Sequence, residues 1–215
     1  MKKSTLLILG LIGVVVLGFI FLYLYGGSVR DSAVAKQETV NESWGNVQSA
    51  YQRRADLIGN LVATVKAAAQ NEKEILIGVT EARAGIAHYT DSVGRIISEQ
   101  QTKIKNAQTP AELESSDVMI MSAYRGFRGF ITEQYPTVQS TQNFSTLQSQ
   151  LEGTENRINT ERNRYNESVK DYNSHIRGTW KRMGLKLVSD ESDNFTVRQM
   201  FEAKPGAEDA PVVKF

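Results

Sequence analysis

The sequence contains no cysteine, only two histidines and only four prolines among its 215 residues. The lack of cysteine excludes disulfide bonds, thiol catalysis and thiolate metal sites. Few prolines, together with many Gln, Glu, Ala and Arg residues, favour long helices. The net charge is +1 and no basic patch stands out, so the charge gives no indication of nucleic-acid binding.

The chain has a single long apolar run, from Leu6 to Tyr25, shortly after Met-Lys-Lys. As a helix, its roughly 20 residues span about 30 Å, the thickness of the hydrocarbon core of a bilayer. A cleaved secretory signal is the alternative, but the apolar core of such signals is about 7–15 residues long. We therefore interpret residues 1–27 as a transmembrane anchor that contacts membrane lipid through Leu6 to Tyr25.

The charges that flank this run predict its orientation. Lys2 and Lys3 precede it, whereas Arg30 and Asp31 follow it and cancel each other. Positive charges tend to stay on the cytoplasmic side of a membrane. The N-terminus is therefore expected in the cytoplasm and the remaining chain outside it.

Apolar residues recur at alternating spacings of three and four over residues 44–96, which is the pattern of a helical heptad seam. Only Arg54 and Glu72 interrupt this seam. Two interpretations stay open for its helical structure. One is a single helix from about Val34 to about Asn106, and the other has a break near Gly85 to Asp91.

Two more helices are predicted further along the chain. Thr109 to Glu112 form a capping box with proline at the first helical position, and that helix ends before Tyr135-Pro136. A second heptad seam runs from Phe144 to Ile176, with Glu155 and Arg162 as its polar interruptions. The charged residues on the seams are therefore features to explain.

These elements predict an all-α fold. Short connections make neighbouring helices antiparallel. Residues 28–183 are expected to form a long antiparallel up-and-down bundle of three or four helices behind the anchor. Residues 184–215 contain Gly, Pro, Asp and Ser without long periodicity, so we expect an extended or poorly ordered tail, in which Phe201 and its neighbours pack locally.

Several blocks of the chain resemble the LemA family, in the same order. They are Arg53 to Val62, Glu72, Ala82-Arg83, Tyr135-Pro136, Asn143 to Gln148, Glu155 to Ile158, Arg162 to Asn166, and Tyr172-Asn173. The resemblance covers about residues 34–178. It implies an N-terminal membrane segment followed by a helical bundle, attached to a bacterial inner membrane, and it implies no particular reaction. After Ile176 the chain lacks the Phe-Pro pair that is common in the family.

Charged side chains within an apolar seam are costly to bury unless they have partners. We predict that an interhelical polar network fixes the register of the helices, as buried polar groups do in coiled coils. Its candidates are the polar residues of the two seams: Arg54, Glu72, Glu155, Arg162, Asn166 and Asn173. A ligand or partner site at the same residues is the alternative, and catalysis is a further one.

An aromatic and basic cluster contains Tyr124, Arg125, Phe127 and Arg128. The helical spacing favours a core position for the rings, and the alternative is a docking surface for a partner or a lipid. Gly126 and Gly129 in the same segment predict a close approach of two helices.

No catalytic motif, nucleotide-binding loop or metal-ligand spacing is present, and His88 and His175 are expected at the surface or at helix ends. We therefore predict no catalytic residue, cofactor or metal. The expected function is that of a non-enzymatic, membrane-anchored scaffold that forms homo-oligomers or binds an envelope protein, and presents a helical rod at the periplasmic surface. Alternatives are a ligand- or lipid-binding envelope sensor with a site between helices, and a cryptic hydrolase.

Overall fold

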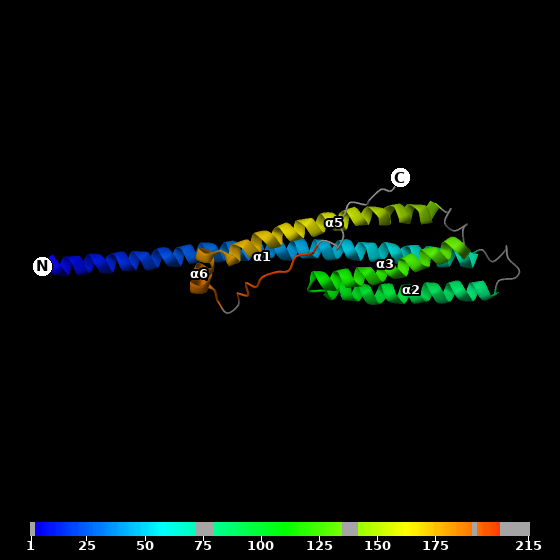
Figure 1. The fold of residues 1–215 in the computed structure, drawn as a ribbon, viewed down its shortest axis with the longest axis horizontal. Helices are drawn as coiled ribbons and strands as arrows, with labels where there is room; N and C mark the ends of the chain where they lie inside the picture. Colours follow the sequence, from blue (N-terminus) through cyan, green and yellow to red (C-terminus); the bar gives the residue numbers. More distant parts are fainter. Residues whose placement is uncertain (1–2, 72–79, 135–141, 191–192, 203–215) are drawn as a thin grey trace, which may run out of the picture. The chain divides into compact units, whose positions relative to one another are not determined.

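The computed structural model describes residues 3–71, 80–134, 142–190 and 193–202 (Figure 1). Within them the predicted all-α class is confirmed, and no strand occurs there. The helices are α1 (Lys3–Asn71), α2 (Thr80–Asn106), α3 (Pro110–Gln134), α5 (Gln142–Arg177) and α6 (Thr179–Val188). The chain divides into two compact units. The first consists of residues 1–43 and 165–200, and the second of residues 44–164 and 201–215.

The first heptad seam belongs to two helices that lie side by side. Gln101 Nε2 of α2 donates to Asp56 Oδ1 of α1 at 2.7 Å, although 45 residues separate them. In one helix they would lie roughly 68 Å apart. The single helix from Val34 to Asn106 is therefore wrong. A break near Gly85 to Asp91 is wrong as well, because α2 runs through it.

The periodicity predicted one continuous helix because α1 and α2 both bury apolar stripes of the same spacing. The residues between the two helices, including Glu72, lie outside the described part of the chain.

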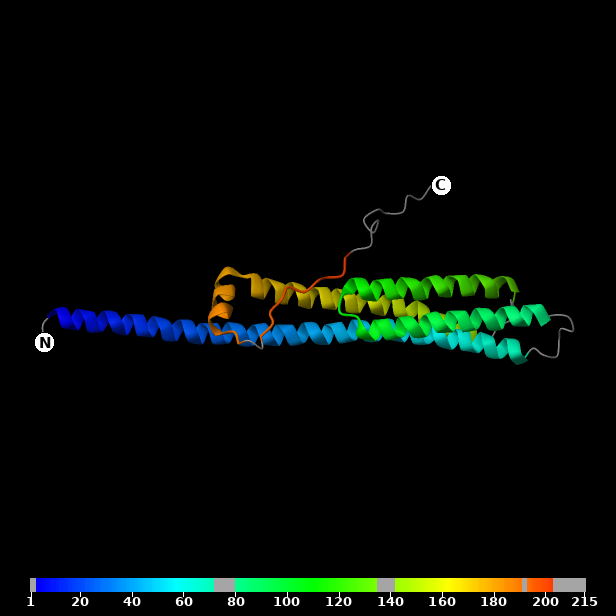
Figure 2. The same cartoon turned by 90° about the horizontal axis from the view of Figure 1, so that it is seen from below.

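In the second unit, segments of α1, α2, α3 and α5 lie side by side (Figures 1 and 2). The seam of α1 is confirmed as a buried stripe, and Leu57 and Val62 widen it as expected of a helix with several neighbours. The fully buried side chains of this unit include Val47, Ile58, Leu61, Ile104, Leu113, Ile120, Phe127, Ile131 and Ile158.

The turn between α2 and α3 has one of the two bonds of the predicted capping box, and the second is shifted by one residue, from Thr109 to Gln108. The Glu112 N–H donates to Thr109 Oγ1 at 3.3 Å, and Glu112 Oε2 accepts from the Gln108 N–H at 2.7 Å. On α1, Gln48 Nε2 donates to the carbonyls of Ile104 and Ala107, each at 3.1 Å. These bonds satisfy backbone groups at the two helix ends and in the turn between them.

Gly126 of α3 allows the close helix approach that the sequence predicts, whereas Gly129 does not contribute to it. A Cβ at Gly126 would lie 2.8 Å from the Tyr89 hydroxyl oxygen of α2, and one at Gly129 would meet no atom within 4 Å. The Tyr89 ring stacks on Phe130 with centroids 4.9 Å apart. That stacking restrains the ring from moving aside.

Gly126→Ala is expected to lower the free energy of unfolding by about 1 kcal/mol or more, because overpacking outweighs the better helix propensity of alanine. Gly129→Ala is the matched control and should raise that free energy by up to about 1 kcal/mol. Urea unfolding followed by circular dichroism measures both. In a Tyr89→Phe background the penalty of Gly126→Ala should disappear, and a penalty that persisted would contradict the steric explanation.

In the first unit, the N-terminal part of α1 presents its apolar residues to the outside, whereas Val29, Ala33 and Val40 further along are buried. Residues 9–25 are exposed throughout, and burial begins at Gly26. Among the described residues, α1 is the one helix that is long and apolar enough to cross a membrane. After α5 ends at Arg177, one residue leads into α6, which extends to Val188 within the segment expected as a tail.

Candidate functional site: a buried charge network

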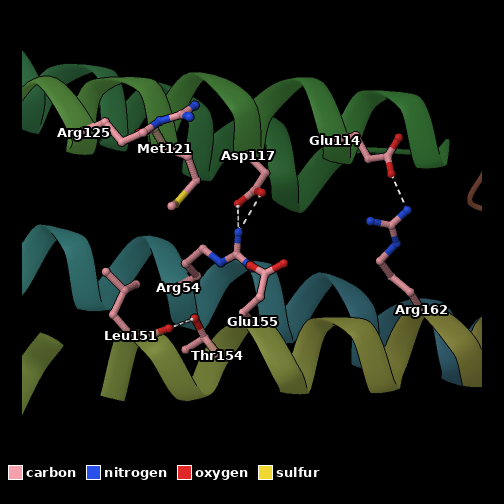
Figure 3. Close-up of polar contacts among 9 residues, drawn as sticks. All are labelled: Arg54, Glu114, Asp117, Met121, Arg125, Leu151, Thr154, Glu155 and Arg162. Atoms are coloured by element: carbon pink, nitrogen blue, oxygen red, sulfur yellow. Dashed lines mark hydrogen bonds and ion pairs between the residues drawn. The ribbon is translucent and has the colours of Figure 1, made fainter. Parts of the chain in front are cut away.

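Arg54 is the centre of an ion-pair network in the second unit (Figure 3). Its Nη1 donates to both carboxylate oxygens of Asp117 on α3, at 2.8 and 3.1 Å. Its Nη2 donates to Glu155 Oε2 on α5 at 2.5 Å. The Arg54 side chain is 5% exposed, compared with 18% for Asp117 and 49% for Glu155. One guanidinium thus joins three helices. Its planar group has five N–H donors and can bind two carboxylates at once.

A second ion pair joins α3 and α5 in the same unit. Arg162 Nη2 lies 2.6 Å from Glu114 Oε1, and the Arg162 guanidinium carbon lies 4.7 Å from the centroid of the Phe201 ring. Arg162 also donates to the Glu202 carbonyl at 3.1 Å. Phe201 is buried and stacks on Trp44 of α1. Phe201 therefore packs on residues distant in sequence, whereas Val197 and Met200, also expected to pack locally in the tail, are exposed.

In the first unit, two α5 side chains bind an extended backbone segment. Asn173 Nδ2 donates to the Arg198 carbonyl at 2.8 Å, and Asn173 Oδ1 accepts from the Arg198 N–H at 2.9 Å. The Tyr165 hydroxyl donates to the Gln199 carbonyl at 3.0 Å. These bonds satisfy backbone groups that have no strand or helix partner, so the segment is held in place.

The predicted network residues therefore have different roles. The structure brings Arg54 and Glu155 together, pairs Arg162 with Glu114, and directs Asn173 to a backbone segment instead of another helix. Asn166 is half-buried on α5, and Glu72 lies outside the described residues.

Sequence reasoning missed the acidic partners Glu114 and Asp117 on α3. They are three residues apart and therefore lie on one helix face. They also flank buried residues of α3, Leu113 and Ser116. A search for acidic residues beside the apolar positions of the predicted helix offered the signal that would have found them.

The docking surface suggested by Tyr124, Arg125, Phe127 and Arg128 is wrong for its two rings. Tyr124 and Phe127 are buried, whereas Arg125 and Arg128 are exposed. The rings fill the core because they follow the helical spacing of the other buried residues on α3.

The two histidines lie in different environments. His88 is exposed, whereas His175 is buried near the end of α5.

Two open grooves are lined by described residues. One, of about 550 Å³, is lined mostly by polar residues of α1 and the end of α2, such as Gln52 and Lys105. The other, of about 760 Å³, lies in the first unit beside α6. Neither groove is bordered by Arg54 or Arg162. Among the described residues, no three His, Asp or Glu side chains gather as metal ligands would.

Tyr51 of α1 lies beside the network, with the Arg54 guanidinium carbon 5.9 Å from its ring centroid. Burial raises the pKa of Tyr51 to about 12 from the ordinary 10.0, and the nearby Asp117 and Glu114 add to the rise, while Arg162 and Arg54 oppose it. Burial also raises the pKa of Tyr124 in this unit.

These tyrosines predict alkaline unfolding. The folded state keeps Tyr51 protonated where the unfolded chain ionises it, so its stabilisation is complete below pH 10.0 and is lost as the pH rises towards about 12. The loss amounts to about 3 kcal/mol. Tyr51→Phe should remove that part of the pH dependence in urea unfolding at several pH values. An unchanged alkaline slope would contradict the assignment.

Comparison with known proteins identifies a family. The model of the LemA family matches residues 43–215. The match begins after the apolar segment and continues through the C-terminal segment, beyond the range of about residues 34–178 that the sequence blocks indicate. No curated protein matches the chain. The family and the apolar part of α1 are together compatible with a membrane-anchored helical protein.

Proposed function

Because the chain belongs to the LemA family, we propose that it is a non-enzymatic, membrane-anchored scaffold that self-assembles or binds an envelope protein. The observation that carries the proposal is α1. This single helix contains the apolar segment at its N-terminal end and the network residue Arg54 further along. The same element thus serves as the anchor and as part of the helical core.

The proposed architecture is an antiparallel up-and-down bundle. The short connection of α2 to α3 and the ion pairs from α1 to α3 and α5 support it, since each requires neighbouring helices. A bundle of this kind offers exposed helix faces to partners. On α3, Val118 and Met119 are exposed apolar residues that suit such a contact.

The charged groups of the network favour a structural role over a catalytic one. Arg54 is bound by two carboxylates and Arg162 by Glu114, so these groups satisfy one another instead of facing a substrate. The position of both described grooves away from Arg54 and Arg162 also favours a scaffold over a sensor with a ligand between its helices.

Self-assembly is tested by disulfide crosslinking in intact membranes, which is direct here because the chain has no cysteine. Met119→Cys should give crosslinked homodimers. Ser98→Cys, at an exposed position of α2, is the control for random collisions. A protein that stays monomeric in both variants, and at every concentration after detergent extraction, would reject assembly and leave binding of an envelope protein to a pull-down.

The proposed location is the bacterial inner membrane, with the helices after α1's apolar segment on the periplasmic side. The support is Lys2 and Lys3 ahead of the apolar segment. Ser49→Cys places a thiol at an exposed position of α1. A membrane-impermeant maleimide should label it from outside once the outer membrane is permeabilised. Labelling only after the inner membrane is broken would reverse the orientation.

A further inference from the structure

The short helix α6 has an apolar face that the described residues of its unit leave exposed. Trp180, Met183 and Leu187 are 74%, 52% and 61% exposed. Their spacing of three and four residues places them on one face of the helix. The helix packs against the protein through Gly184 and Leu185, which are buried.

α6 packs against α1 where the apolar segment of α1 ends. A Cβ at Gly26 would lie 2.4 Å from Val188 Cγ2, so this approach requires a glycine. A Cβ at Gly184 would lie 3.7 Å from Tyr25 Cε1. Tyr25 is the last residue of the apolar segment, and α6 therefore lies at the level expected for the membrane surface.

Polar bonds tie both ends of α6 to the next turn of α1. Before α6, His175 Nε2 donates to the Val29 carbonyl at 3.0 Å. After it, Arg30 Nε lies 2.6 Å from Asp193 Oδ2, and Arg30 lowers the pKa of the Asp193 carboxyl through that bond. Val29 and Arg30 lie roughly 6–8 Å beyond Tyr25 along the helix. The two ties hold α6 beside the end of the apolar segment.

Basic residues border the apolar face. α6 contains Lys181, Arg182 and Lys186 and no acidic residue. Arg182 and Lys186, with Arg177 of α5, line the groove of about 760 Å³. Asp193 also lines it, but its carboxylate is bound by Arg30. The groove therefore favours an anionic group.

We propose that α6 is an interfacial membrane helix, in which Trp180, Met183 and Leu187 insert among the lipids while Arg182 and Lys186 bind anionic phospholipid headgroups. Amphipathic helices with basic flanks bind membranes in this way, and tryptophan favours the interface. The inference rests on the proposed membrane anchor. It adds a second lipid contact, which fixes how α1 leaves the bilayer.

The two tryptophans of the chain permit a direct test. In a Trp44→Phe variant of the full chain, Trp180 is the sole reporter, and in Trp180→Phe it is Trp44, which packs on Phe201. Both are reconstituted in vesicles of phosphatidylcholine with phosphatidylglycerol that carry a nitroxide quencher near the headgroups. Trp180 should lose most of its emission and shift to shorter wavelength, whereas Trp44 should keep its emission.

The outcomes separate this inference from the proposed anchor. Protein that floats with the vesicles while Trp180 stays unquenched would overturn the interfacial helix alone. Protein that fails to float would overturn the anchor and the inference together. In the Trp44→Phe background, Arg182→Gln with Lys186→Gln should reduce the quenching gained from phosphatidylglycerol, and Lys103→Gln with Lys105→Gln on α2 should leave it unchanged.

Discussion

Replacing Arg54 by glutamine is expected to lower the free energy of unfolding by about 3–5 kcal/mol, the cost of breaking a buried ion pair from one side. The substitution removes the donor that binds Asp117 and Glu155 and leaves their two negative charges close together. Urea unfolding of the full chain in detergent, followed by circular dichroism, measures the loss. The free energy of unfolding of Arg54→Lys should lie between those of the parent protein and Arg54→Gln. Lysine keeps the positive charge, but its ammonium lacks the planar guanidinium that binds both carboxylates.

The matched control is an exposed pair between helices. Lys66 Nζ of α1 lies 2.7 Å from Asp91 Oδ1 of α2, with side chains 42% and 66% exposed. Lys66→Gln should cost at most about 1 kcal/mol, and added salt should reduce even that difference. Equal losses for Arg54→Gln and Lys66→Gln would contradict the structural role of Arg54. They would return the network to the alternative of a ligand or partner site.

Phe127→Ala is expected to cost about 3–5 kcal/mol, since it removes a fully buried ring from α3 and leaves a cavity. Tyr89 would also lose a stacking partner whose ring centroid lies 6.2 Å from its own. The same unfolding measurement reports the loss. The result separates a core residue from a docking residue, the two interpretations that the sequence leaves open.

The controls are the exposed neighbours Arg125 and Arg128. Arg125→Ala and Arg128→Ala should each change the free energy of unfolding by no more than about 0.5 kcal/mol. Should Phe127→Ala instead keep the stability of the parent protein and weaken the recovery of a partner in a pull-down, the ring would belong to a docking surface and the core assignment would fail.

Local spacing explains which parts of the fold were predictable. The capping box at Thr109 to Glu112 and the buried stripe around Ile58 depend on residues one or two turns apart, so their signals lie within short windows of sequence. The division between α1 and α2 has no such signal, because both helices repeat apolar residues at the same period. A contact such as Gln101 to Asp56 becomes visible only when the chain has turned back.

The network shows the same limit. A charge on the apolar seam indicated that Arg54 has a partner, but the sequence could not choose between Glu155 and the many other acidic residues. Three helices meet at Arg54, and their register decides that Asp117 binds it together with Glu155. Asn173 similarly required a partner, and its partner is the backbone of Arg198 in an extended segment.

The sequence alone determined the helical class, the apolar segment at the N-terminus and the family resemblance, because composition and periodicity act within each segment. The few prolines predicted long helices, and the single long apolar run predicted one membrane anchor. Only the tertiary structure decided where the first seam divides, which acids bind Arg54 and which face of α6 is left uncovered. Each of these depends on residues distant in the chain, and packing alone brings them together.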